Sequence, residues 1–251
     1  TYMIMRKLCT GQIDGYIAVS HFIRNRMIEE GFEADRIVVY SQNRAARSAT
    51  KSRDEIRASY GIQSEDFVIG SIGRLVPLKG NGTVLEALKS VVKKYPHTKF
   101  LLVGDGPDRQ TLMRQAEQLK LTDHIIFAGF CTDIENMYPA FDLVVFPTHY
   151  EALGYIPYEA MYYRRPIIAS RTGGVPELVI DDYNGLLVPP AMPEQWTEAI
   201  LRMIENPQLR MDFVENGTTF YEKYLTRNNC EEQLLATYEK LISSKKEREG
   251  I

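Results

Sequence analysis

The feature that most constrains the fold is a regular alternation of apolar strands and amphipathic helices that begins at Phe67. Short apolar runs recur from this point, at residues 67–72, 99–103, 124–127, 141–146, 166–170 and 185–188. Helical patterns lie between them, and in the segment 83–95 the apolar residues cover one helical face. Near-continuous apolar strands separated by helices are typical of a parallel sheet that is buried on both faces. We therefore predict an α/β domain built on a Rossmann-like, doubly wound parallel sheet.

We expect the residues before this alternation to be the last part of another, N-terminal domain. Strands are predicted at 14–20 and 36–40, with a helix from His21 to Glu30 between them. Two strands and one helix cannot bury a core of their own. We therefore divide the chain into the tail of an N-terminal domain, a linker with a first helix, the main domain, and a C-terminal helix and tail, at residues 1–45, 46–66, 67–225 and 226–251.

Charge and composition argue against several classes of protein. A formal net charge of −3 at pH 7 argues against wholesale nucleic-acid binding. The three cysteines are far apart and lack CxxC spacing, which is typical of neither a disulfide framework nor a zinc site. The sequence has no signal peptide pattern and no apolar run long enough to span a bilayer. We expect a cytoplasmic protein, with peripheral contact to the cytoplasmic face of a membrane left open.

Two cations lie in the loop that follows the first strand of the alternation. Arg74 and Lys79 both occur in the segment Gly73 to Gly80, directly before a helix. Ligands of open α/β sheets bind at the carboxyl ends of the strands. Two cations beside the positive end of a helix dipole form a good anion site. A solvated loop with incidental charges has the same composition, so this motif alone leaves both interpretations open.

Two glutamates, Glu151 and Glu159, follow the fourth strand and span the start of a helix. Surface carboxylates on a helix are the ordinary interpretation of such a pair. Apolar and aromatic neighbours weaken that interpretation, because a carboxylate in such surroundings needs hydrogen-bond donors, which ligand hydroxyls can supply. Carboxylates for sugar hydroxyls and cations for a diphosphate together suit a nucleotide-sugar site.

Glycines end three of the other strands. Gly104 and Gly106 follow the second strand, the pair 129–130 (Gly-Phe) follows the third, and the pair 173–174 (Gly-Gly) follows the fifth. Glycine lets backbone groups approach a ligand closely, although a plain turn gives the same pattern. The GxGxxG fingerprint of dinucleotide-binding proteins is not completed. Nothing in the sequence demands a bound metal.

Taken together, these segments resemble the C-terminal, donor-binding half of retaining glycosyltransferases with the GT-B fold, specifically the group-1 (family 4) class. The resemblance runs from about residue 14 to about residue 241. It rests on six short motifs in the family's order: Gly-Arg-Leu-x3-Lys-Gly at 73–80, Val-Gly-Asp-Gly-Pro at 103–107, Phe-x-Gly-Phe at 127–130, Phe-Pro-Thr-x2-Glu at 146–151, Glu-Ala-Met at 159–161 and Gly-Gly-Val-Pro-Glu-Leu-Val at 173–179.

The resemblance implies a role for each candidate residue. Arg74 and Lys79 would hold the diphosphate and stabilise charge on the leaving group, and Glu151 would face the donor sugar. Glu159 would accept hydrogen bonds from the ribose hydroxyls. The implied donor-binding positions are Gly73, Gly104, Gly106, Phe130, Leu153, Gly154 and Glu159.

The resemblance also implies the partners of the reaction. A nucleotide-diphosphate sugar would serve as co-substrate, with no metal and no resident cofactor. The acceptor would be a glycan, a lipid or a small molecule, glycosylated with retention of configuration. The acceptor-binding domain of this fold would precede residue 1, so we expect weak or no transfer by this chain alone.

Some positions depart from the family pattern, and other functions stay open. Ala152 stands where the family usually has glycine, and Tyr-Tyr-Arg-Arg at 162–165 replaces a helix end rich in small residues and glycine. The alternatives within enzymes are a nucleotide-sugar epimerase or a sugar phosphorylase of the same fold. The alternative from another class is a nucleotide-sugar-binding module without catalytic activity.

Overall fold

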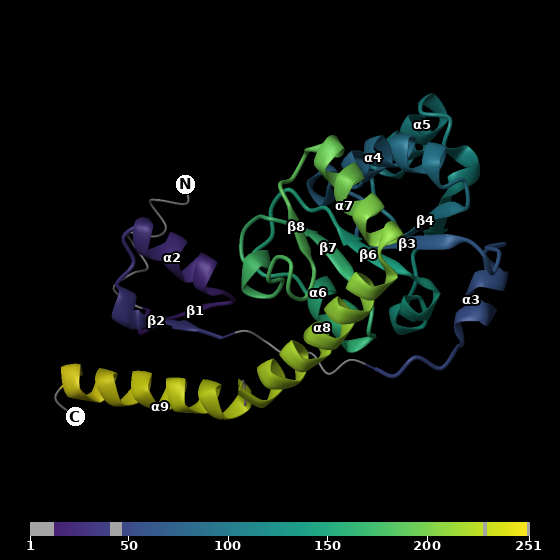
Figure 1. Ribbon diagram of the computed structural model, residues 1–251. Helices are drawn as coiled ribbons and strands as arrows, with labels where there is room; N and C mark the ends of the chain where they lie inside the picture. Colours follow the sequence, from purple (N-terminus) through teal and green to yellow (C-terminus); the bar gives the residue numbers. More distant parts are fainter. Residues whose placement is uncertain (1–12, 41–46, 228–229, 250–251) are drawn as a thin grey trace. The chain divides into compact units, whose positions relative to one another are not determined.

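The computed structural model describes residues 13–40, 47–227 and 230–249 (Figure 1). The predicted boundary between residues 45 and 46 falls outside these ranges. The chain divides into two compact units, of which the larger comprises Ala45–Glu222. The smaller contains the described residues before and after that span.

The larger unit is built on a six-stranded sheet in which every neighbouring pair of strands is parallel. Its spatial order is β5-β4-β3-β6-β7-β8. The predicted strands are confirmed, each overlapping an observed one: β3 Phe67–Ile72, β4 Thr98–Val103, β5 Ile125–Gly129, β6 Leu143–Phe146, β7 Ile167–Ser170 and β8 Leu186–Val188. This order confirms the predicted doubly wound, Rossmann-like sheet, because the chain adds strands first on one side of β3 and then on the other.

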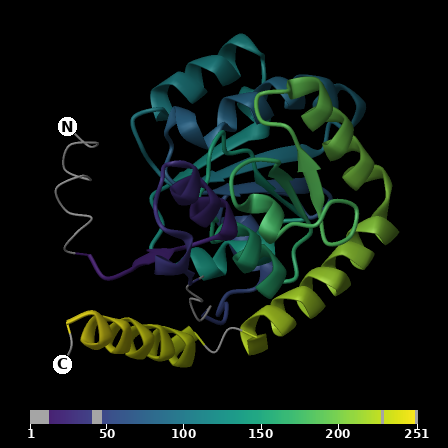
Figure 2. The same ribbon diagram turned by 90° about the vertical axis from the view of Figure 1, so that its left-hand side faces the viewer.

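Helices cover both faces of this sheet, as the two views in Figures 1 and 2 show. The elements are α3 Arg53–Ser59, α4 Asn81–Lys94, α5 Arg109–Gln118, α6 Ile156–Tyr162, α7 Pro193–Glu205 and α8 Pro207–Arg227. On one face α4 and α7 pack together over the strands, and the core there includes Leu85, Phe100 and Trp196, all fully buried. Burial of this apolar surface is the main stabilising term of the unit.

The buried side chain of Arg57 ties α3 to the sheet. Arg57 is only 2 % exposed and donates hydrogen bonds to the carbonyl oxygens of Ala140 and Asp66 and to the carboxylate of Asp142. The helix begins with a capping box, in which Ser52 and Glu55 satisfy each other's backbone N–H groups. The segment that follows the linker is thereby fixed at the amino ends of β3 and β6.

The smaller unit contains a short parallel strand pair. Strands β1 Tyr16–Ala18 and β2 Ile37–Val39 pair in register, and α2 His21–Glu29 connects them. Ser20 caps α2 by accepting a hydrogen bond from the N–H of Ile23. The C-terminal helix α9, Cys230–Glu249, also belongs to this unit.

Helix α6 ends without glycine. Arg164 takes the left-handed conformation there, with φ of 55°. The N–H of Arg165 then donates to the carbonyl oxygen of Ala160 at 2.7 Å, which closes the last turn before Pro166. A non-glycine residue in this conformation costs on the order of 1–2 kcal/mol.

Candidate active site at the switch point of the sheet

Strands β3 and β6 are neighbours at the centre of the sheet, and the chain leaves them in opposite directions. After β3 it continues to β4 and β5, whereas after β6 it continues to β7 and β8. A crevice forms at the carboxyl ends of two such strands, and this is where open α/β sheets bind ligands. The loops that follow β3 and β6 carry Arg74, Lys79 and Glu151.

The structure brings Lys79 and Glu151 into direct contact. The Nζ atom of Lys79 lies 2.7 Å from Oε2 of Glu151, and both side chains are partly exposed. Lys79 ends the 3-10 turn Pro77–Lys79, and its Nζ lies 5.3 Å from the centroid of the Phe146 ring. A cation and a carboxylate that are 72 residues apart in the sequence therefore form one polar centre at the carboxyl edge.

Backbone contacts hold the two loops together. The N–H of His149 donates to the carbonyl oxygen of Leu78 at 2.8 Å, and the hydroxyl of Thr148 shares its one proton between Tyr150 O at 2.9 Å and Leu78 O at 3.3 Å. These bonds tie the loop after β6 to the turn that presents Lys79. The main chain therefore holds the two loops that carry Lys79 and Glu151 next to each other.

The loop after β7 supports Glu151 from the opposite side. Gly173 has φ of 55°, and a Cβ atom added to it would lie 1.8 Å from the carbonyl oxygen of Glu151. The N–H of Gly174 donates to that same oxygen at 3.1 Å. Only glycine permits this approach, so the Gly-Gly pair fixes the backbone of Glu151.

A second wall of the site combines the loops after β3 and β4. The N–H of Leu75 donates to Asp105 O at 2.9 Å, and a Cβ atom added to Gly104 would lie 1.9 Å from Gly73 O. Arg74 projects from this wall and is exposed. Across residues 13–40, 47–227 and 230–249, no hydrogen bond or ion pair engages its guanidinium. Its donors are therefore directed to solvent or to a ligand.

Glu159 lies on α6 and has a buried hydrogen-bond partner. The phenol of Tyr138 is completely buried and donates to Oε2 of Glu159 at 2.6 Å. Burial raises the pKa of Tyr138 well above its usual range, and the charge of Glu159 raises it further. Tyr138 therefore stays protonated and acts as a donor, which holds one carboxylate oxygen of Glu159 in place.

Replacing Tyr138 by phenylalanine is expected to destabilise the chain by about 1.5–3 kcal/mol, the usual cost of losing a hydrogen bond to a charged group. The ring volume is retained, so the change isolates the hydroxyl. Urea unfolding of the wild-type chain and of Tyr138→Phe measures the difference. Tyr95→Phe is the control, because its hydroxyl donates to Glu205 at an exposed position. Equal stability of both variants and the wild type would show that the buried bond contributes nothing.

The remaining predicted positions spread along the same edge. Leu153 is buried, and Gly154 packs against Glu151 and the Phe146 ring. Phe130 follows β5 and is 79 % exposed. Because β4 and β3 separate β5 from β6, Phe130 lies away from the ion pair. The edge therefore holds a polar centre near β3 and β6 and an exposed aromatic ring near β5.

Tyr138 and the supporting role of the loop after β7 were not predicted from the sequence. The apolar surroundings of Glu159 do indicate that this carboxylate needs a donor. Nothing in the sequence pattern identifies Tyr138, which lies 21 residues upstream in the 3-10 turn Tyr138–Ala140. Only the packing of α6 against this turn brings the two side chains together.

Two negative findings apply to the described part of the chain. No group of three or more His, Cys, Asp or Glu side chains is arranged there to hold a metal ion. None of the helices in it has the length and apolar character needed to cross a membrane.

The six-stranded doubly wound sheet, with charged residues on the two loops at its switch point, defines a domain of the GT-B glycosyltransferase type. The family model described as glycosyl transferases group 1 matches residues 52–220. The chain belongs to this family.

Several known proteins are similar to the chain. Alpha-D-kanosaminyltransferase of Streptomyces kanamyceticus is 30% identical over 191 residues, which cover 75% of this chain and 49% of that protein. The crystal structure of Anabaena Alr3699/HepE in complex with UDP and glucose superposes with a TM-score of 0.85 at 25% identity, covering 93% of this chain and 66% of that one.

A further structure covers only a C-terminal domain. It is the domain of LpcC, a glycosyl transferase group 1 family protein from Francisella tularensis, and it matches at 30% identity with a TM-score of 0.63. The match spans 70% of this chain and 94% of that one. By contrast, the chain spans 49% and 35% of the length of two of the curated relatives it matches.

Proposed function

We propose that this chain is the donor-binding part of a retaining glycosyltransferase that uses a nucleotide-diphosphate sugar. The observation that carries the proposal is the Lys79–Glu151 ion pair at the switch point, together with the guanidinium of Arg74 on the same loop as Lys79, which has no partner among the described residues. A diphosphate needs cations, and a sugar ring needs hydrogen-bond acceptors for its hydroxyls. The loops after β3 and β6 together offer the cations and the hydrogen-bond acceptor.

In this proposal the cations act on the leaving group. As the bond between sugar C1 and the diphosphate oxygen breaks, negative charge develops on the diphosphate. Lys79 and Arg74 stabilise that charge electrostatically, which lowers the barrier. Glu151 lies beside Lys79, where its carboxylate accepts hydrogen bonds from the donor sugar and helps to orient the ring.

The acceptor hydroxyl attacks C1 from the face that the diphosphate leaves, so the configuration at C1 is retained. The leaving oxygen lies on that same face and takes the proton of the attacking hydroxyl. The reaction needs no resident cofactor in this scheme, and the positive charge comes from side chains.

The nucleoside end is assigned to the other side of the crevice. Glu159 accepts hydrogen bonds from the ribose hydroxyls, and the bond from Tyr138 to Oε2 holds its carboxylate in place. The exposed Phe130 and the backbone around it contact the base. Uridine is the first base to test, because the Anabaena structure contains UDP.

The relatives are named for different reactions, kanosaminyl transfer in one case and glycosylation of D-inositol 3-phosphate in another. We propose that a separate acceptor-binding part is needed for transfer, and that this chain by itself transfers weakly or not at all.

Calorimetric titration with UDP, GDP and ADP tests the donor site. We expect one of the three to bind, and we expect Arg74→Ala to weaken that binding by about 10-fold to 100-fold, as for the loss of one charge-assisted hydrogen bond. Arg114→Ala is the matched control, because Arg114 is exposed on α5. Equal affinities for Arg74→Ala and the wild type would refute the assignment of Arg74 to the diphosphate.

A further inference from the structure

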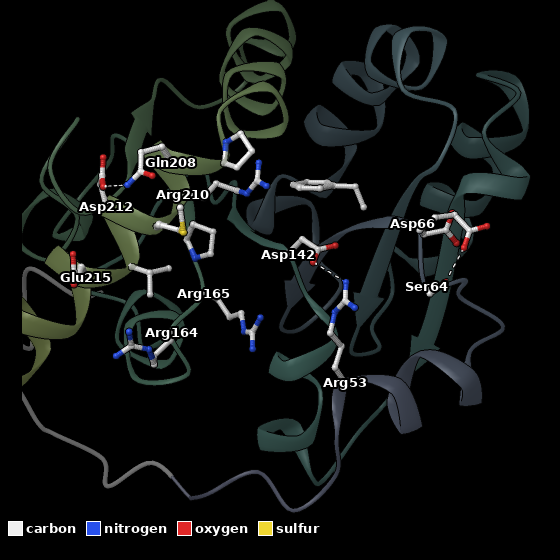
Figure 3. Close-up of a pocket in the computed structure, with 16 residues that line it drawn as sticks. Arg53, Ser64, Asp66, Asp142, Arg164, Arg165, Gln208, Arg210, Asp212 and Glu215 are labelled. Carbon is white, nitrogen blue, oxygen red and sulfur yellow. Dashed lines mark hydrogen bonds and ion pairs between the residues drawn. The ribbon is translucent and has the colours of Figure 1, made fainter.

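A pocket lies at the amino ends of the strands, at the sheet edge opposite the candidate active site (Figure 3). Its volume is about 780 Å³, within the range of small-molecule sites. The lining residues come from α3, from the starts of β3 and β6, from the turn between α6 and β7, and from α8. Four of them are arginines, namely Arg53, Arg164, Arg165 and Arg210.

The one acid at the centre of the pocket is already neutralised. Asp142 accepts from Arg57 at 2.7 Å, from Arg53 at 3.2 Å and from the N–H of Val68 at 2.8 Å. Arg57 is buried behind the pocket wall. Two guanidinium groups therefore meet a single carboxylate at this point of the pocket. The whole lining carries five acids and four arginines, so the excess of positive charge is local to the surroundings of Asp142.

Arg165 and Arg210 add to the positive charge near Asp142. Arg165 donates to the carbonyl oxygen of Phe141 at 3.0 Å, and its buried Nε has no hydrogen-bond partner. Arg210 donates to the carbonyl oxygen of Ile204 at 3.0 Å and stacks 5.2 Å from the Phe67 ring centroid. Within the described ranges neither arginine forms an ion pair.

Burial acts on the pKa of both of these arginines. It lowers the pKa of Arg165 and of Arg210, in each case opposed by the charge of Asp142, and for Arg165 the charges of Arg53 and Arg57 add to the lowering. An anion placed between these guanidinium groups would remove the repulsion among them.

Of the other four acids of the lining, Asp66, Asp212 and Glu215 lie toward the rim, and Glu65 accepts from the hydroxyl of Ser64 at 3.0 Å. Asp66 accepts from the N–H of Gln63 at 2.9 Å, and Asp212 accepts from Gln208 at 2.8 Å. Figure 3 shows Asp212 and Glu215 on one side of the pocket and Asp66 on the other, whereas Arg53 and Arg165 reach toward the middle. Charge is thus separated, with cations inside and hydrogen-bond acceptors around them.

We propose that this pocket binds a small phosphorylated molecule, with its phosphate between Arg53 and Arg165 and its hydroxyl groups toward the rim acids. Guanidinium groups bind phosphate oxygens in bidentate geometry, and a phosphate dianion pairs with more than one guanidinium group. The volume of about 780 Å³ is far larger than a phosphate ion, so the pocket has room for the rest of the ligand beside its phosphate. This site is separate from the proposed donor site, because it lies at the other edge of the sheet.

Titration calorimetry with glucose 6-phosphate tests the proposal, with glucose as the uncharged control probe. We expect glucose 6-phosphate to bind, glucose not to bind, and Arg165→Met to weaken binding by about tenfold or more, the change that losing one charge-assisted hydrogen bond produces. Arg114→Met, outside the pocket, should bind as the wild type does. Arg53→Met is the second variant, since Arg53 is half exposed and its loss leaves the Arg57–Asp142 pair intact.

Two further titrations distinguish binding in this pocket from binding at the proposed donor site. The affinity for glucose 6-phosphate should be unchanged in Lys79→Ala and in the presence of saturating UDP. If neither glucose 6-phosphate nor inorganic phosphate binds at millimolar concentration, the proposal is wrong. It is equally wrong if Lys79→Ala abolishes binding while Arg53→Met and Arg165→Met retain it. If Arg165→Met fails to fold, the result for Arg53→Met decides.

Discussion

Replacing Lys79 by alanine is expected to lower the turnover of sugar transfer by the full-length protein by about 10²–10³-fold. This is the usual effect of removing one group that stabilises charge in the transition state. Lys79 is the cation held against Glu151, 2.7 Å from its carboxylate, so its loss also leaves Glu151 without a counter-charge. Steady-state kinetics with a nucleotide-diphosphate sugar measures the change in kcat.

The control for this experiment is Lys89→Ala on the exposed face of α4. It removes the same charge from the same unit without touching the crevice, and we expect its kcat to match the wild type. The chain's own affinity for the nucleotide gives an independent readout, expected to fall about 10-fold to 100-fold in Lys79→Ala. A kcat in Lys79→Ala within twofold of the control would exclude leaving-group stabilisation by this residue.

Replacing Gly173 by alanine is expected to have the largest effect on stability and to disrupt the site at the same time. The left-handed backbone at Gly173 alone penalises alanine by about 1–2 kcal/mol. In addition, the new methyl group would lie 1.8 Å from Glu151 O, so the loop that carries Glu151 must shift. We expect a lowered melting temperature together with loss of nucleotide-sugar binding.

Gly61→Ala is a matched control for the backbone term. Gly61 also has a positive φ, 65°, but an added Cβ atom meets nothing within 4 Å. Gly61→Ala should lower the melting temperature by roughly 2–8 °C, the range that a destabilisation of about 1–2 kcal/mol gives in a chain of this size. Gly173→Ala should lower it further, and only Gly173→Ala should weaken donor binding. If both variants had the same melting temperature and the same affinity for the donor, the close approach of residue 173 to Glu151 would have no structural role.

Much of the candidate site can be predicted from the sequence, because its residues directly follow predicted strands. Arg74, Lys79 and Glu151 each follow a predicted strand, and parallel strands place such loops at one edge of the sheet. The pairing of Lys79 with Glu151 depends on a further fact, which is that β3 and β6 are neighbours. The strand pattern does not give that order, although the resemblance to GT-B proteins implies it.

Contacts between segments that are far apart in the sequence could not be predicted from the sequence pattern. The bond from Tyr138 to Glu159 depends on how α6 packs on a 3-10 turn, and neither residue has a sequence signature for the other. The same holds for the arginine pocket, in which residues 53, 165 and 210 come from three separate elements. Periodicity identifies which face of an element is buried, but not which element covers it.

The sequence by itself therefore determined the class of fold, the strands and helices, and the loops that carry the charged residues. These follow from the spacing of apolar side chains and from strand-end glycines, which act over a few residues. The tertiary structure decided which of those loops meet, which buried donor holds Glu159, and that arginines from separate elements surround Asp142. Such contacts depend on the packing of elements far apart in the chain, where a shift of one strand or helix would change every partner.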